Sequence, residues 1–211
     1  MKVGLLNESM ERVERRKALV RLIQEIHPEK IGALFFPAGY EREFVQFTQD
    51  SNFHYFFGFD EPSVMVYQPI QGSAVLYIPH YSVDRAVWLP LKFDEQLLRA
   101  LVIQETKKLG KTVPGYDTGP FYSEGAVEEL CKNLKQQVIA GQFLFTALDG
   151  IATECRVVID LLCQYVPGLR EKIIDIAPLI AELRRTKSQR ELEYLHHAAN
   201  ITMDAHMAAA S

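Results

Sequence analysis

The first part of the chain alternates apolar and charged positions with the period of an α-helix. Four apolar residues follow the spacing i, i+3, i+4, i+7: Leu19, Leu22, Ile23 and Ile26. Charged side chains occupy the opposite face. Because proline lacks an amide hydrogen and clashes with the preceding turn, we expect this helix to end before Pro28.

The next apolar runs are too short for helices and predict strands. Residues 31–36 are almost wholly apolar and are followed by Pro37 and Gly39, a pattern typical of a strand buried on both faces. Residues 63–67 and 74–78 flank a turn that contains Gly72. This pair predicts an antiparallel hairpin.

The second half of the chain predicts helices and strands in alternation. A helix is expected over 94–108, with Asp94 as its N-cap and Gly110 just past its end. Further elements are expected in this order: helix 123–134, strand 143–146, helix 155–165, strand 173–176. Interleaved helices and strands with one hairpin predict an α/β fold, a mixed β-sheet flanked by helices.

The last segment predicts a long helix. Ser188 and Glu191 form a capping box, in which the serine accepts from the backbone and the glutamate reaches back to it. From Leu192 the helical pattern continues to Ser211 without a Gly or Pro to end it. We therefore expect the natural chain to extend past Ser211.

Composition narrows the function classes. A formal net charge of −4 and a pI near 5.9 argue against nucleic acid as a partner. No stretch approaches the roughly 20 apolar residues of a membrane span, and the first residues lack the apolar region of a signal peptide. Three cysteines without CxxC spacing indicate reduced thiols and a cytoplasmic location, without a disulfide or zinc site.

No pattern in the sequence indicates a catalytic residue or a metal ligand. The residues most typical of metal sites are the six histidines, His27, His54, His80, His196, His197 and His206. His196 and His197 are adjacent, and adjacent side chains on a helix point about 100° apart, which disfavours binding of one shared ion. The sequence also contains no HExxH motif. G-x-S-x-G, Walker A and G-x-G-x-x-G patterns are also missing from the sequence.

Two other groups have a structural interpretation. Asp117-Thr118-Gly119 spells the aspartic-protease tripeptide, but Pro114-Gly115 and Pro120 around it indicate a turn. The aromatic run Phe53–Phe57 favours core packing over an exposed binding surface, so we expect Phe53 and Tyr55 to be buried.

Residues Phe47–Pro62 carry the most specific pattern in the chain. They contain a D-S-N-F-x-Y core (Asp50 to Tyr55), followed by Gly58-Phe59 and Glu61-Pro62. This segment closely resembles the N-terminal domain of aminopeptidase P (Xaa-Pro aminopeptidase) and, more loosely, that of its prolidase and creatinase relatives. Arg15-Arg16 is similar to the opening R-R pattern of that family, and residues 183–202 are similar to its linker and following helix.

The resemblance implies a two-domain enzyme. Residues 1–178 would be the N-terminal domain, a mixed sheet flanked by helices, and residues 179–211 the linker and first helix of a pita-bread catalytic domain. In this family the catalytic domain holds two divalent metals, usually Mn²⁺, through ligands that lie beyond that helix. The chain alone is therefore expected to hold no cofactor and to have no peptidase activity.

The resemblance also implies partners: the chain's own C-terminal catalytic domain, further copies in a homodimer or homotetramer, and peptides with proline at the second position. Trp88 lies where relatives place a tryptophan that reaches a substrate pocket, so it is the candidate substrate contact. Ala86, Pro90 and Thr48 depart from the family pattern and put the detail of that pocket in question. Alternative interpretations are a stand-alone binding or dimerisation module with this fold, and the equivalent domain of a prolidase.

Overall fold

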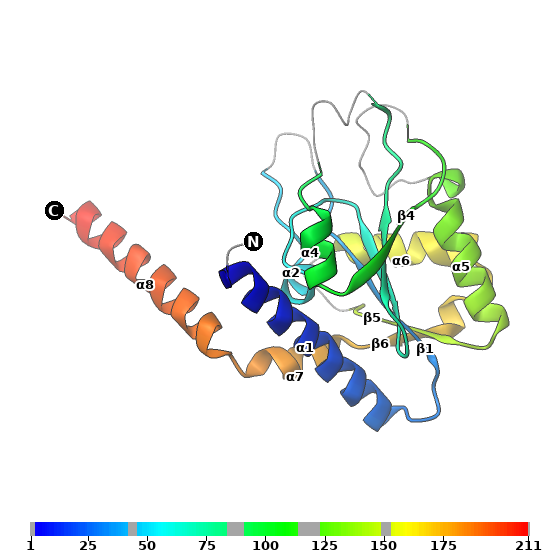
Figure 1. Cartoon of the computed structure of the whole chain (residues 1–211), viewed down its shortest axis with the longest axis horizontal. Helices are drawn as coiled ribbons and strands as arrows, with labels where there is room; N and C mark the ends of the chain where they lie inside the picture. The colour runs from blue at the N-terminus through cyan, green and yellow to red at the C-terminus, as the bar shows by residue number, and fades with distance from the viewer. Residues whose placement is uncertain (1–2, 42–45, 84–90, 114–122, 149–152, 211) are drawn as a thin grey trace.

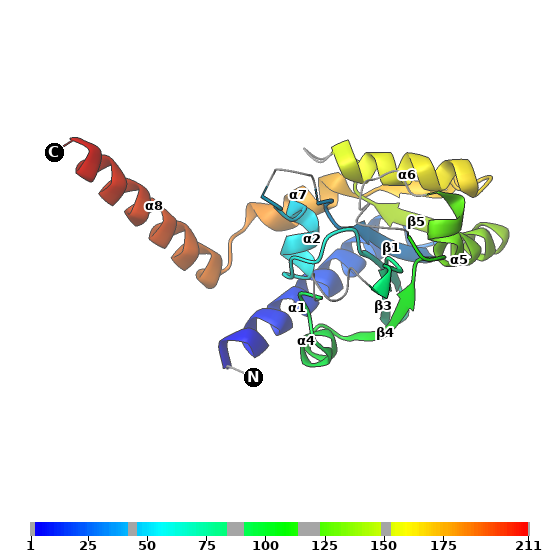
Figure 2. The same ribbon diagram turned by 90° about the horizontal axis from the view of Figure 1, so that it is seen from above.

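The computed structural model describes residues 3–41, 46–83, 91–113, 123–148 and 153–210. In this part of the chain, six strands form one mixed sheet in the order β4-β3-β2-β1-β5-β6. Helices α1, α2, α4 and α7 cover one face, and α5 and α6 cover the other (Figures 1 and 2). The predicted fold class, a mixed sheet flanked by helices, is confirmed.

Strand β1 (Gly32–Pro37) lies at the centre of the sheet. It pairs antiparallel with β2 (Met65–Pro69) and parallel with β5 (Phe143–Thr146). Its side chains alternate between two apolar clusters: Phe35 packs with α5 and α6, and Phe36 packs with α1 and α2. This explains why the run is apolar at every position, as predicted for a strand buried on both faces.

The predicted hairpin is also confirmed. Strand β2 pairs antiparallel with β3 (Ala74–Ile78), and Gly72 lies in the turn between them, where its amide donates to the carbonyl of Pro69.

The predicted helix 94–108 is wrong in its second half. Helix α4 covers only Glu95–Ala100, and Asp94 caps it as expected, its Oδ1 accepting from the Leu97 amide at 2.7 Å. The chain then turns at Val102, whose φ is +56°, and β4 (Ile103–Lys108) pairs in parallel with β3. Five of its six side chains are exposed, so β4 has no apolar alternation to detect, and the free edge of β3 supplies its hydrogen bonds.

The elements after β4 follow in the predicted order, but the helix predicted over 123–134 begins as a 3₁₀ turn and ends later, at Ile139. A 3₁₀ turn at Glu124–Val127 leads into α5 (Glu128–Ile139), and β5 follows. Helix α6 (Thr153–Tyr165) and a 3₁₀ turn at Arg170–Lys172 precede β6 (Ile173–Asp175). Strand β6 pairs in parallel with β5.

Two helices were not predicted. Helix α2 (Ser51–Phe56) is six residues long and lies inside the segment that resembles aminopeptidase P. Helix α7 (Ala177–Arg185) places Ile180 in the same core as Leu19 and Ile23 of α1 (Val3–Ile26). The domain boundary expected at 178/179 falls within the first turn of α7 and remains a prediction.

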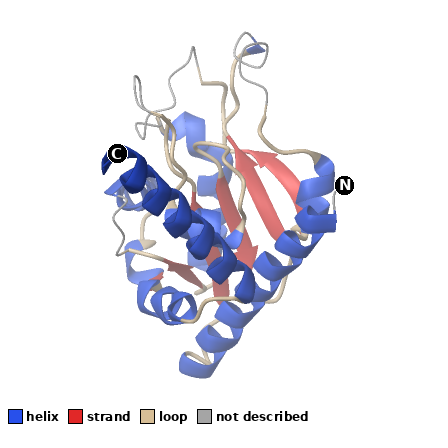
Figure 3. Cartoon of the chain, turned by 90° about the vertical axis from the view of Figure 1, so that its left-hand side faces the viewer, coloured by secondary structure: helices blue, strands red, loops and turns tan. Residues whose placement is uncertain are grey.

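Helix α8 (Gln189–Ala210) begins at the predicted capping box and extends away from the rest of the fold (Figures 1 and 2). In the view of Figure 3 it lies in front of the rest of the chain. Its side chains are exposed from Leu192 to Ala210. We call the remainder, from α1 to α7, the body. Among the described residues, no helix combines the length and apolar character that crossing a membrane requires.

Candidate functional site

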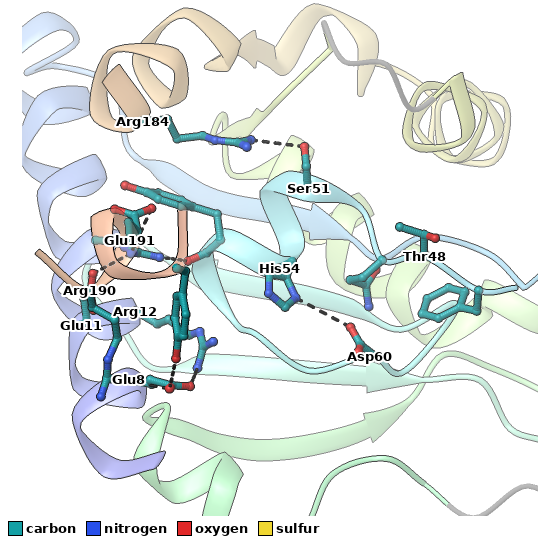
Figure 4. Close-up of a pocket in the computed structure, with 15 residues that line it drawn as sticks. Glu8, Glu11, Arg12, Thr48, Ser51, His54, Asp60, Arg184, Arg190 and Glu191 are labelled. Carbon is teal, nitrogen blue, oxygen red and sulfur yellow. Dashed lines mark hydrogen bonds and ion pairs between the residues drawn. The ribbon is translucent and has the colours of Figure 1, made fainter. Parts of the chain in front are cut away.

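A cleft of about 560 Å³ lies where α1, α2, α7 and α8 meet, and we call it the α1–α8 cleft (Figure 4). Its lining is mostly charged or aromatic: Glu8, Glu11, Arg12, Arg15, Phe47, Thr48, Gln49, Ser51, His54, Tyr55, Asp60, Arg184, Arg190, Glu191 and Tyr194. Four arginines face four carboxylates, so the lining is close to electrically neutral.

Arg15 connects three helices across this cleft. Its Nη1 donates to the carbonyl oxygen of Tyr55 at 3.0 Å, and its guanidinium lies 4.1 Å from the centre of the Tyr55 ring. Its Nη2 lies 2.6 Å from Glu11 on α1 and 3.3 Å from Glu191 on α8. The first arginine of the R-R pattern therefore joins α1, the end of α2 and the start of α8.

Arg16, the second arginine of that pattern, points into the body and is only 3% exposed. It donates to the carbonyls of Phe56, at 2.8 Å, and Leu101, and it stacks over the ring of Phe57. Burial lowers the pKa of this guanidinium to about 10. A cation that caps the last carbonyls of α2 fixes this short helix against α1.

Arg184 of α7 approaches α2 from its other end. Its Nη1 donates to Asn52 Oδ1 at 2.9 Å. It also donates to Ser51 Oγ at 3.2 Å (Figure 4). Its guanidinium carbon lies 5.5 Å from the centre of the Tyr55 ring. Ser51 and Asn52, the S-N of the signature, thus bind the linker arginine.

Tyr55 corrects one expectation. Phe53 is fully buried as predicted, but Tyr55 is only half-buried and lines the α1–α8 cleft. Helix α2 turns Phe53 and Phe56 into the core, and Tyr55 is rotated towards the arginines because successive helical residues differ by about 100°. Burial raises the pKa of the Tyr55 hydroxyl, opposed by the charge of Arg15.

Gln49 and Asp50 hold the signature segment in shape. The buried Gln49 amide accepts from the Gly39 amide at 2.8 Å and donates to the carbonyls of Phe59 and Glu61, each at 3.1 Å. Asp50 is the N-cap of α2, accepting from the amides of Asn52 and Phe53. These residues serve local structure and carry no reaction.

Gly58 of the signature is required by its backbone and by a neighbour. Its φ is +68°, a conformation that side chains disfavour. A Cβ at this position would lie 2.0 Å from the guanidinium carbon of Arg12, whose Nη1 is 3.6 Å from Glu8. Glycine here leaves room for an arginine of the cleft.

His54 and Asp60 form the one histidine–carboxylate pair in the described lining, with Nδ1 and Oδ1 3.7 Å apart. Both side chains are more than half exposed, so the contact is a weak surface pair. Among the contacts of the described residues, neither side chain meets a nucleophile, so the pair does not form a triad.

The other candidates from the sequence are dispersed or outside the described residues. His80 bonds Lys108 and Thr112, His27 lies near Phe145, and the three histidines after residue 195 sit on exposed α8. Within the described ranges, no group of three or more His, Cys, Asp or Glu side chains could hold a metal ion. Trp88 and Asp117-Thr118-Gly119 lie outside the described residues, so their roles remain predictions.

The cleft itself was missed from the sequence, although the sequence held a signal. Glu8, Glu11, Arg12 and Arg15 recur at i, i+3, i+4, i+7. They therefore form one charged face of α1, next to the apolar face that enters the core. The three segments that were similar to aminopeptidase P (the R-R pair, the signature and the linker) converge on this cleft, about 180 residues apart in sequence at the extremes.

Comparison with known proteins finds one family model that matches the first half of the chain. Residues 13–111 match the family model described as "Aminopeptidase P, N-terminal domain". No curated protein matches the chain.

Solved structures match over nearly the whole chain. A variant of Escherichia coli aminopeptidase P is 21% identical with a TM-score of 0.62, covering 94% of this chain and 43% of that chain. E. coli aminopeptidase P with the inhibitor Pro-Leu gives the same identity and coverage with a TM-score of 0.60. Icp55 from Saccharomyces cerevisiae is 17% identical with a TM-score of 0.60, covering 88% of this chain and 38% of that chain.

The chain therefore spans about two fifths of the length of these structures. The expectation drawn from the sequence is confirmed: residues 13–111 match the N-terminal domain of aminopeptidase P, and the chain has the fold of the corresponding part of the aminopeptidase P structures.

Proposed function

We propose that this chain is the N-terminal, non-catalytic part of a Xaa-Pro metallo-aminopeptidase, and that its body holds the catalytic domain through α8. The supporting observation is the convergence on the α1–α8 cleft. Arg15 binds Glu191 of α8, and Arg184 of the linker binds Ser51 and Asn52. Arg15, which binds α8, and Ser51 and Asn52, which bind the linker, all lie within the residues that match the family model.

The chemistry of the proposed enzyme resides outside these residues. Two divalent metals, expected to be Mn²⁺, would supply a metal-activated hydroxide and polarise the carbonyl that precedes proline. The described side chains do not form a site for such a pair, and no step is assigned to them. Their part is to bind and orient the domain that carries the ligands.

Two further roles belong to the same proposal. The body would contribute to a homodimer or homotetramer, and it would form one wall of the substrate pocket, with Trp88 as the substrate contact. A wall that excludes water and long chains selects short N-terminal segments and strengthens electrostatic interactions inside the site. A cytoplasmic location fits the reduced thiols expected from the sequence.

The test is to express the product of the complete open reading frame with Mn²⁺ and assay it on matched tripeptides, Ala-Pro-Ala and Ala-Ala-Ala. Release of alanine from the first peptide alone supports the proposal. Cleavage restricted to Xaa-Pro dipeptides favours the prolidase alternative, and an inert product favours a binding or dimerisation module.

The 211-residue chain provides the matched control in the same assay. It is expected to be inactive and to bind no Mn²⁺ tightly. A stoichiometric, submicromolar Mn²⁺ site seen by isothermal titration would contradict the assignment of the metals to another domain.

A further inference from the structure

The connection between α7 and α8 is short and closed at both ends. Thr186 follows α7 in an extended conformation, with φ −90° and ψ 127°. Lys187 Nζ donates to the carbonyls of Arg184 and Arg185 and so closes the end of α7. Ser188 and Glu191 form the observed capping box, with distances of 2.9 and 3.2 Å, and so close the start of α8. The facing ends of both helices are therefore capped by hydrogen bonds, and only residues 186–188 connect them.

Helix α8 touches the body through polar groups in its first turns. Glu191 lies 3.3 Å from Arg15, Arg190 lies 3.6 Å from Glu8, and the Tyr194 hydroxyl donates to Glu8 at 3.0 Å. We call these five residues the α1–α8 latch. From residue 195 to 210, every side chain of α8 is exposed. The contacts of the latch, which fix the direction of α8, are therefore ion pairs and a hydrogen bond.

The latch also contacts the signature segment, Phe47–Pro62. Arg15, which holds Glu191, also donates to the carbonyl of Tyr55 at the end of α2. The side chains of Arg15 and Glu191 are 17% and 26% exposed, so the pair is shielded more than an ordinary surface pair. By contrast, Arg99 and Glu95 on α4 form a pair of similar length that is 80% and 86% exposed.

We propose that Glu191 and Tyr194 are positioning residues that set the direction in which α8 leaves the body. In the peptidase proposed above, on which this second step rests, they thereby set the position of the catalytic domain against the pocket wall. Breaking the latch leaves the apolar clusters of the body intact, because none of its members belongs to them. The α1–α8 cleft, about 560 Å³ in volume, lies beside the latch and leaves space in which α8 can change its direction.

Glu191→Gln is the sharpest variant. Glutamine at this capping-box position can still accept from the Ser188 amide, so α8 keeps its start, whereas the ion pair with Arg15 is lost. Tyr194→Phe removes only the hydroxyl that reaches Glu8. Glu95→Gln is the matched control, because it breaks an Arg–Glu pair whose two residues do not line the cleft.

The first measurement needs no catalysis. Nitroxide labels attached through genetically encoded azides at Ala205 on α8 and Gln136 on α5, both exposed, avoid the native cysteines. Electron–electron double resonance should give one narrow distance distribution for the unmodified 211-residue chain. Glu191→Gln should broaden it at least two-fold and Tyr194→Phe by less, with Glu95→Gln unchanged. A distribution unaffected by Glu191→Gln would overturn the proposal.

The same distance measurement at high salt concentration tests the ion pairs of the latch independently. At 1 M NaCl the Debye length falls to about 3 Å, so the ion pairs of the latch weaken. The distribution of the unmodified chain should then broaden towards that of Glu191→Gln, which itself should change little. Equal broadening of both would mean that charges other than this pair hold α8.

The second measurement uses the product of the complete open reading frame. If the latch positions the pocket wall, Glu191→Gln should raise KM for Ala-Pro-Ala several-fold with kcat within two-fold, and Glu95→Gln should change neither. Unchanged KM in an active enzyme would refute the catalytic consequence of the latch. An enzyme inactive without any substitution would refute the proposed function instead, and the label distances would still decide the latch.

Discussion

The body and α8 belong to one chain but are held by different forces. The body contains two clusters of apolar side chains on either face of the sheet, many of them fully buried. Helix α8 is fixed through the five polar residues of the latch, and its apolar side chains Leu195, Ile201 and Met207 are more than half exposed. Burial is insensitive to salt and small changes in angle, whereas ion pairs depend on both. The position of α8 is therefore much easier to change than the fold of the body.

Helix α2 contacts both the apolar core of the body and the cleft that α8 lines. One side of it, Phe53 and Phe56, packs in the core, and the other side, His54 and Tyr55, faces the cleft. Arg16 and Arg15 hold the end of α2 from the buried and the exposed side, respectively. The six residues of α2 therefore connect the apolar core of the body to the residues that contact α8.

The largest expected effect on stability comes from the side of α2 that is buried in the core. Phe53→Ala should lower the free energy of unfolding by about 3–5 kcal/mol, because a fully buried aromatic ring leaves a cavity. Tyr55→Ala, at the half-buried position two residues on, should cost clearly less. Urea titration followed by circular dichroism measures both, and equal losses would contradict the division of α2 into a core side and a cleft side.

The next effect tests whether Gly58 makes room for Arg12. Gly58→Ala should cost about 2–3 kcal/mol, from the positive φ and from the contact with the guanidinium. Gly141→Ala is the matched control, because Gly141 has φ +73° with nothing within 4 Å of the added Cβ. Gly141→Ala should therefore show the backbone cost alone. Adding Arg12→Ala should recover part of the loss at Gly58 and none at Gly141.

A smaller effect is expected from pH in the core of the body. Burial raises the pKa of the Cys131 thiol from 9.0 to about 11. The folded state therefore favours the protonated thiol, and this contribution is complete below pH 9 and is lost as the pH rises towards 11. The loss should be about 1–2 kcal/mol.

Urea titrations of the reduced protein at pH 8, 9 and 10.5 measure that loss, with Cys131→Ala as the comparison. The variant should lose less stability over this range. Tyr77, whose pKa burial raises to about 12, remains in both proteins and contributes equally above pH 10. Identical pH profiles would show that the thiol does not titrate with folding.

The smallest effect on stability should come from the latch. Glu191→Gln should change the free energy of unfolding of the 211-residue chain by less than about 1 kcal/mol, because a single partly exposed ion pair contributes little. A loss above 2 kcal/mol in the same urea titration would show that α8 is part of the cooperative body. That outcome would remove the contrast between the two regions.

Most elements could be predicted from local pattern. The apolar period of α1, the continuous apolar run of β1 and the capping box at Ser188 each determine their element through neighbouring residues, and all three are confirmed. Strand β4 could not be predicted, since its exposed side chains carry no alternation and its partner is β3. Helix α2 was hidden because its six residues are too few to show a period.

The sequence by itself determined most of the elements, the capping residues Asp94 and Ser188 and the resemblance to aminopeptidase P, because each of these rests on residues close together in the chain. The tertiary structure decided that Tyr55 faces a cleft, that Gly58 leaves room for Arg12, and that Arg15 meets Glu191. These contacts join residues that are far apart in the sequence, and no local pattern encodes a distance across the fold. They depend on how α1, α2 and α7 pack around one apolar core, which fixes where the polar sides of those helices meet.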